Sequence, residues 1–432
     1  MSFELRSLLP PGTTATPSGA ATARAAAAHA RRATATHALR GSAILLVITA
    51  CAGERPQSAR EPDAPTGTQQ FWSLQRKGAN AQQRSVEPAY WTAVRAAGIT
   101  FVRLVPDGWA ANGRDFLIGD ASAFTTIDTL DLAVLRRVLD DAHDAGVRIV
   151  LTMFSLPGAR WRQLNQNVDD GRLWTELRYH AQAAAFWREL ADALRGHPAI
   201  VAYNPLNEPH PARADGIVGR AGFMEWYAHN EGTAADLNGF NRRIVATIRE
   251  VDATTPILLD GWFHASAEGL TMLEPVDDAA TLYAFHVYEP WEYTTYRVNA
   301  GRFSYPAAMP RGWSADTRAA AFRSVAAWAA QHSIPARRIV VSEFGVDRRV
   351  RGAQAWLEDI VAQINANGWH WAFYAYRSDD AWGGMDYELG TAPAGEAYWT
   401  AVERGADPES LKRRAPNPLW AVLAREFEPA GH

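Results

Sequence analysis

The sequence predicts one α/β domain of the (β/α)8 barrel class, because short apolar runs alternate with longer amphipathic stretches from residue 70 onward. The chain has 432 residues and is 47% hydrophobic, which suffices for one large core, and such barrels run to about 250 residues or more as a single domain. Eight runs are counted as strands. They cover Phe71–Ala79, Thr100–Val105, Arg148–Met153, Ile200–Pro205, Pro256–Asp260, Thr281–His286, Arg338–Ser342 and Trp369–Tyr376.

The stretches between these strands have the periodicity of helices that pack on a sheet; Leu135, Val138 and Leu139 illustrate it. The rival fold is a doubly wound open sheet, but no glycine-rich phosphate loop follows the first strand. In a barrel, the long strand-to-helix connections lie on the face that builds the substrate site. The expected helices include Leu130–Ala145, Leu177–Arg195, Leu237–Val251, Arg318–His332 and Ala353–Asn367, and the long connections are 155–176, 210–235, 287–316 and 377–416.

The N-terminal part predicts export and a lipid anchor. A basic residue and a short apolar stretch end in Ile48-Thr49-Ala50-Cys51, which resembles the lipobox of bacterial lipoproteins, and Cys51 is the only cysteine of the chain. We therefore expect residues 1–50 to be a leader, 51–69 a lipidated, flexible tether, and 70–432 the barrel domain. Two alternatives stay open: a start codon downstream of Met1, and a twin-arginine signal at Arg31-Arg32. The protein would then lie in the periplasm or on the cell surface, attached to the membrane. A net charge of −4 argues against nucleic acid as a partner.

Two glutamates stand where an apolar strand is expected to meet the catalytic face. Glu208 follows the fourth strand in Asn207-Glu208-Pro209, and Glu343 follows the seventh in Ser342-Glu343-Phe344-Gly345. Alone, either residue would more simply be a salt bridge or a helix cap. Together they favour a different interpretation, a pair that cleaves a glycosidic bond with retention, in which an acid protonates the leaving oxygen and a carboxylate attacks the anomeric carbon.

Motifs in the right order make residues 70 to 400 resemble glycoside hydrolase family 5. Besides the two glutamate motifs, they are Arg76-Lys77-Gly78-Ala79-Asn80, Phe101-Val102-Arg103-Leu104 and Phe285-His286-Val287-Tyr288. The resemblance implies that Glu208 is the acid/base and Glu343 the nucleophile. It further implies that Arg103 pairs with the nucleophile, that Asn207 binds the sugar 2-hydroxyl, and that His286 and Tyr288 orient the carboxylates.

Two departures from the family pattern put the sugar subsite in question. Phe154 stands where the family has a histidine, and Tyr376 where it has a tryptophan platform. Arg377, Asp379 and Asp380 can replace stacking with hydrogen bonds or belong to a solvated loop. Further stacking candidates in the long connections are Trp109, Trp291 and Trp382.

The remaining alternatives concern activity. The histidines lack metal-ligand spacing and no nucleotide loop occurs, so neither a metal nor another cofactor is expected. The competing readings are a hydrolase of a neighbouring family in the same clan, an inactive carbohydrate-binding lipoprotein, and a purely structural barrel. The sugar and its linkage stay open.

Overall fold

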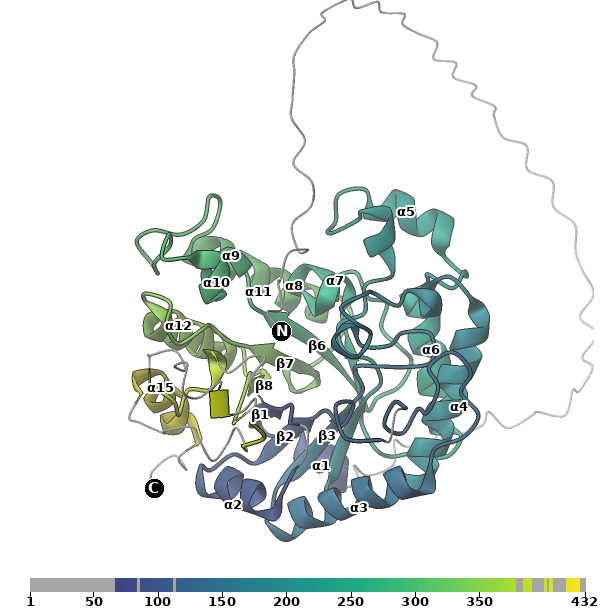
Figure 1. Ribbon diagram of the computed structural model, residues 1–432. Coiled ribbons are helices and arrows are strands. Elements are labelled where there is room, and N and C mark those ends of the chain that lie inside the picture. The colour runs from purple at the N-terminus through teal and green to yellow at the C-terminus, as the bar shows by residue number, and fades with distance from the viewer. Residues whose placement is uncertain are drawn as a thin grey trace, which may run out of the picture. The chain divides into compact units, whose positions relative to one another are not determined.

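The computed structural model describes residues 67–83, 86–111, 114–377, 384–390, 400–401, 404–406 and 417–427. Eight parallel strands close into a barrel in chain order, with β8 paired to β1 (Figure 1). The predicted fold class is therefore confirmed. The strands are β1 (Lys77–Ala81), β2 (Phe101–Leu104), β3 (Arg148–Thr152), β4 (Ile200–Asn204), β5 (Ile257–Asp260), β6 (Thr281–Val287), β7 (Ile339–Phe344) and β8 (His370–Phe373).

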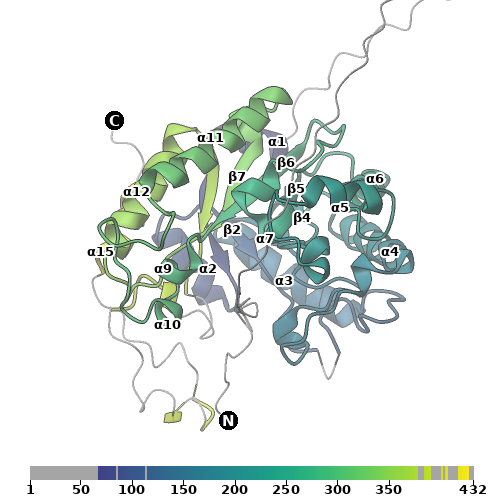
Figure 2. The same cartoon turned by 90° about the horizontal axis from the view of Figure 1, so that it is seen from above.

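Long helices surround the strands in both views of the molecule (Figures 1 and 2). They are α2 (Pro88–Ala96), α3 (Thr129–Asp144), α4 (Leu177–Leu194), α6 (Leu237–Arg249), α11 (Ala315–Gln331), α12 (Ala353–Ala366) and α15 (Pro418–Phe427). Shorter helices are α1 (Gly67–Phe71), α5 (Phe223–Asn230), α7 (Trp262–Ala265), α8 (Ala267–Leu270), α9 (Trp291–Thr294) and α10 (Tyr296–Asn299). Single 3-10 turns are η1 (Arg162–Leu164), η2 (Arg172–Trp174), η3 (Pro211–Asp215) and η4 (Ala336–Arg338).

The strands separate two apolar layers. On β7, Ile339 and Val341 join the large core between strands and helices, whereas Val340 joins a smaller cluster with Leu258 and Leu282 from other strands. This alternation is the period of two that a strand imposes on its side chains. In the part of the chain described above, no helix is both long and apolar enough to cross a membrane.

The first strand differs from the prediction. Phe71–Ala79 was expected to be a strand, but Phe71 ends α1 and β1 begins only at Lys77. Trp72 is 3% exposed, and its Nε1 donates a hydrogen bond to the Val201 carbonyl at 2.9 Å. Its ring packs with Phe101 in the smaller cluster. The apolar pair Phe71-Trp72 therefore covers strand residues and does not extend the sheet.

Other boundaries move by a few residues. Residues 67–69, expected at the end of the flexible tether, belong to α1. Strand β7 continues through Glu343 to Phe344, and β8 stops at Phe373 instead of Tyr376. The register between β6 and β7 shifts after Phe285, so that His286 pairs with Glu343. Such irregularities re-aim side chains beside active sites.

Candidate active site

Polar side chains gather at the carboxyl ends of the strands, the face on which barrel enzymes carry their sites. Five of them are no more than 5% exposed. They are Asn80 of β1, Arg103 of β2, Asn204 of β4, Asp260 of β5 and Glu343 of β7. Buried polar groups at this density require mutual hydrogen bonds.

Arg103 provides most of these hydrogen bonds. Its guanidinium donates to the Oδ1 atoms of Asn80 at 3.1 Å, Asn204 at 2.7 Å and Asn207 at 2.6 Å. It also forms an ion pair with Asp260 at 3.5 Å. Only arginine offers five donors in a fixed planar fork, which explains the residue type.

Glu343 receives its hydrogen bonds from two sides. Arg103 Nη1 donates to its Oε1, and the Tyr288 hydroxyl donates to its Oε2 at 2.7 Å. Burial alone would raise the pKa of the carboxyl, but the positive charges of His286 and Arg103 and these hydrogen bonds lower it below its usual value. Glu343 is thus held ionised, the state that a nucleophile needs.

Glu208 sits in a different setting. Its backbone has a φ of 50°, and its N–H donates to Asp260 Oδ2 at 3.0 Å, which fixes the turn after β4. Its carboxyl lies 2.8 Å from His286 Nδ1. Burial raises the pKa of Glu208, and the nearby carboxylates of Glu343 and Asp260 add to this rise against the opposing effect of His286. The pKa values of the two glutamates therefore move in opposite directions.

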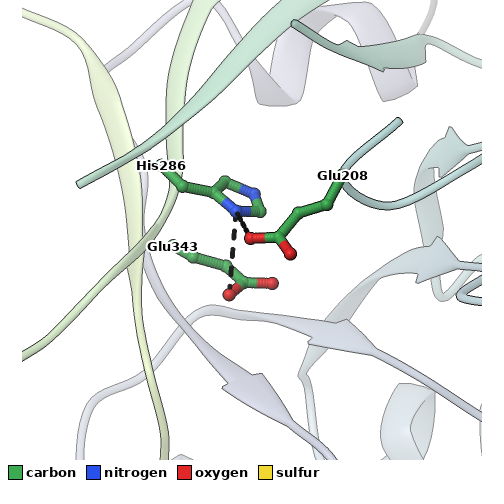
Figure 3. A group of neighbouring side chains, drawn as sticks. All are labelled: Glu208, His286 and Glu343. Carbon is green, nitrogen blue, oxygen red and sulfur yellow. Dashed lines mark hydrogen bonds and ion pairs between the residues drawn. The ribbon is translucent and has the colours of Figure 1, made fainter. Parts of the chain in front are cut away.

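The Nδ1 atom of His286 contacts both carboxyl groups (Figure 3). Burial opposes a charge on its ring, but Glu343, Glu208 and Asp260 together raise the pKa of the imidazole. Its Nδ1 is 3.8 Å from Glu343 Oε2, and its Nε2 is 3.6 Å from Asp260 Oδ2. The His286 imidazole therefore keeps its proton to a higher pH than a free imidazole does.

The two glutamate carboxyls face each other across a short gap (Figure 3). One oxygen of Glu208, one of Glu343 and a ring nitrogen of His286 all lie within 4.8 Å of one another. Such a trio can also hold a metal ion. However, the guanidinium of Arg103 already supplies positive charge to Glu343, and a cation there would be repelled.

Aromatic side chains lie beside Arg103 and Tyr288, two of the residues that bond Glu343. The Phe154 ring lies 5.9 Å from the Arg103 guanidinium and 5.1 Å from the Trp161 ring. Trp291 of α9 meets the Tyr288 ring edge-on at 6.4 Å. Phe154, Trp161 and Trp291 are all partly exposed, so their rings remain accessible to a ligand.

Two residues predicted to contact sugar, Trp109 and Tyr376, are instead buried and pack within the protein. Trp109 is 6% exposed, its Nε1 donates to the Gln83 carbonyl at 2.9 Å, and its ring packs on Phe116. Tyr376 is 2% exposed, and its hydroxyl donates to the Ala93 carbonyl of α2 at 3.2 Å. Trp382, Asp379 and Asp380 lie outside the described residues. Arg377 pairs with Glu388 at 2.6 Å.

Sequence reasoning missed residues that the fold brings to the site. Tyr374, not Tyr376, approaches from the end of β8, with its ring 6.4 Å from that of Tyr288. A Cβ on Gly345 would lie 2.8 Å from the Tyr374 carbonyl, so the glycine of the Glu343 motif lets the two segments meet. Asp260 was placed at the end of an expected strand, the same signal that singled out Glu208, but was not taken as a site residue.

A parallel eight-stranded barrel with paired glutamates at the ends of β4 and β7 defines the class of barrel glycosidases. The chain belongs to one particular family of that class: residues 63–380 match the family model "Cellulase (glycosyl hydrolase family 5)". The predicted resemblance is therefore confirmed, and the chain is a glycosidase.

Solved structures with the same fold include endoglucanase Cel5A from Pseudomonas stutzeri. It is 16% identical, with a TM-score of 0.55 over 84% of this chain and 98% of that one. Endoglucanase Cel5A from Thermotoga maritima is 16% identical, with a TM-score of 0.55 over 81% of this chain and 96% of the other. A structure described as a glycoside hydrolase reaches a TM-score of 0.58 at 16% identity, over 82% of this chain and 99% of that chain. No curated protein sequence matches significantly. At these identities the structures share the fold.

Proposed function

We propose that this protein is a retaining hydrolase of β-linked saccharides, with Glu343 as nucleophile and Glu208 as acid/base. One observation carries the proposal: two neighbouring carboxyl groups have pKa values shifted in opposite directions. The pKa of Glu343 is lowered and that of Glu208 is raised. Their oxygens lie within 4.8 Å, which supports retention, because retaining pairs are about 5–5.5 Å apart and inverting pairs roughly 6.5–9.5 Å.

In the first step, Glu343 attacks the anomeric carbon while Glu208 gives its proton to the departing glycosidic oxygen. Arg103 and Tyr288 keep Glu343 anionic and aimed. Arg103 occupies the Oδ1 of Asn207, so the amide NH2 of Asn207 is the group left to donate to the sugar 2-hydroxyl. In the second step, Glu208 takes a proton from a water molecule whose oxygen attacks the anomeric carbon. The bond to Glu343 breaks, and the sugar leaves with retained configuration.

We further propose a β-1,4-linked glucan or mannan as the substrate. Solved structures with this fold include endoglucanases, and one of them, from Thermotoga maritima, was solved with mannotriose. The experiment is a panel of β-glucans, mannans, xylans and aryl glycosides, with products separated by size and the first-formed anomer identified by NMR. A β product from a β substrate is expected. An α product would contradict retention, and no turnover of any substrate in the panel would contradict the proposed substrate class.

Export and lipid anchoring are a separate proposal, because Cys51 and the leader lie outside the described residues. The support is the lipobox-like run that ends at the chain's single cysteine. Stable attachment requires two acyl chains or more, since one chain binds membranes only marginally. Mass spectrometry of the mature N-terminus should find a diacylated or triacylated Cys51. An unmodified Cys51, or cleavage at another residue, would contradict the anchor.

A further inference from the structure

The chain takes an unusual backbone path directly after β5. Phe263 (φ 54°, ψ 57°), His264 (φ 54°, ψ 43°) and Ala265 (φ 56°) are three consecutive left-handed residues, and none is glycine. L-amino acids visit this region as single residues, because Cβ comes too close to the next carbonyl oxygen. A run of three persists only where the surrounding structure enforces it, and such strain concentrates at functional sites.

Packing on both sides enforces the turn. Trp262 is fully buried, with its ring 5.0 Å from Phe223 and 5.7 Å from Tyr227 of α5. Ala265 is also fully buried. A Cβ on Gly269 of α8 would lie 1.8 Å from the Trp262 carbonyl oxygen, so α8 lies directly against the turn. The flanking residues are thus fixed, and the one exposed side chain of the turn is that of His264.

The His264 ring lies next to the acid/base segment. Its centroid is 4.6 Å from that of His210, two residues after Glu208, and the ring also interacts with the Glu208 backbone. His210 is held in turn by a hydrogen bond of 2.9 Å from its Nε2 to the Ile217 carbonyl. The His264 side chain is therefore solvent-accessible and lies against the segment that follows Glu208.

His264 is uncharged at neutral pH. Desolvation in this crowded setting, helped by the positive fields of His210 and Arg213, lowers the pKa of His264 to about 3. A neutral imidazole has one N–H donor and one ring-nitrogen acceptor. Both match sugar hydroxyl groups, which donate and accept.

We propose that His264 binds the sugar unit that departs on the Glu208 side, and so helps to select substrates with a saccharide leaving group. This inference rests on the proposed function, in which Glu208 protonates the leaving oxygen. Attack by Glu343 expels the leaving group on the opposite side, toward Glu208. The hydrogen-bond donors to Glu343 are Arg103 of β2 and Tyr288 of the segment after β6. His264 instead contacts the segment that follows Glu208.

The test compares two kinds of substrate for wild type, His264→Ala and His264→Asn. The first kind is a β-1,4-linked tetrasaccharide of glucose or of mannose, and the second is the 4-nitrophenyl glycoside of the corresponding disaccharide, which has no sugar in its leaving group. In His264→Ala, the ratio of kcat/KM for tetrasaccharide to kcat/KM for aryl glycoside should fall by about 10- to 100-fold, the effect of one buried hydrogen-bonding group left unpaired.

Two controls separate binding from folding. Asparagine tolerates the left-handed conformation and offers a donor and an acceptor, so His264→Asn should recover part of the ratio. His229→Ala removes an exposed imidazole of α5 whose Nδ1 lies 2.7 Å from the Glu225 carbonyl oxygen of the same helix, and it should leave the ratio unchanged. Thermal unfolding of each variant shows whether it is folded.

The outcomes distinguish this inference from the proposed function. If wild type turns over no substrate of either kind, the proposed function fails. If wild type is active but His264→Ala changes both substrates equally, or neither, then His264 does not bind the leaving sugar and the inference is overturned.

Discussion

The hydroxyl of Tyr288 is a sharp probe of the nucleophile, because it donates to Glu343 Oε2 at 2.7 Å and touches no other carboxyl oxygen in the described residues. Tyr288→Phe removes this donor and leaves the ring. A hydrogen bond to a charged group contributes about 1.5–3 kcal/mol. At about 1.36 kcal/mol for each pKa unit, its loss should raise the pKa of Glu343 by about 1–2 units.

The sign of the effect on activity follows from the role of Glu343. The pKa of Glu343 is lowered in the folded protein, so the carboxylate is ionised over most of the working range and becomes protonated only in acid. The acid limb of the kcat/KM profile reports this ionisation in the free enzyme. In Tyr288→Phe that limb should move to higher pH by about 1–2 units, while the alkaline limb, set by Glu208, moves less.

The assay is kcat/KM for an aryl glycoside, measured across the pH range at constant ionic strength. Tyr283→Phe is the matched control. Tyr283 lies on β6, which ends one residue before Tyr288, but its ring faces Trp328 of α11 and its hydroxyl accepts from the Val276 N–H at 2.9 Å. This variant should lose stability and keep the wild-type profile. An unmoved acid limb in Tyr288→Phe, or an equal shift in both variants, would refute the reasoning.

Three further changes test other parts of the site. Arg103→Ala removes the guanidinium from the buried carboxylates of Glu343 and Asp260, so the free energy of unfolding in urea should fall by about 3–5 kcal/mol; a loss below about 1 kcal/mol would contradict the network. Phe154→His should change the ranking of substrates in the panel more than the melting temperature, because Phe154 is partly exposed; a variant that only unfolds would show core packing. Trp291→Ala should raise KM by roughly 2- to 10-fold, the range of an aromatic contact of about 0.5–1.5 kcal/mol, and an unchanged KM would place its ring outside the substrate path.

The barrel could be predicted because most of its strands are short apolar runs that are recognisable in the local sequence. Ile200–Asn204 and Ile339–Phe344 are apolar runs that end at the catalytic face, and the polar residue that follows or closes each run identifies the site. Arg103 was expected from the family resemblance of Phe101-Val102-Arg103-Leu104, and a buried charge in an apolar strand requires a partner.

The errors arise where distant contacts decide the structure. Phe71-Trp72 reads as a strand, yet Trp72 is held by a hydrogen bond to Val201, far away in sequence. Tyr374 and Tyr376 could not be separated by alternation, because β8 ends at Phe373 and the period of two no longer applies beyond it. The left-handed turn at His264 has no sequence signal, since packing of Trp262 and Gly269 imposes it.

The most direct test of the central assignment is azide rescue of Glu208→Ala and Glu343→Ala with a β-aryl glycoside. Glu208→Ala should still form the glycosyl-enzyme when the leaving group is good, and azide should then speed turnover and give a β-glycosyl azide, with retained configuration. Glu343→Ala should give an α-glycosyl azide, because azide attacks directly in place of the missing carboxylate. The exchanged pattern, α from Glu208→Ala and β from Glu343→Ala, would reverse the two roles. Near-normal rates in both variants without azide would contradict the site itself.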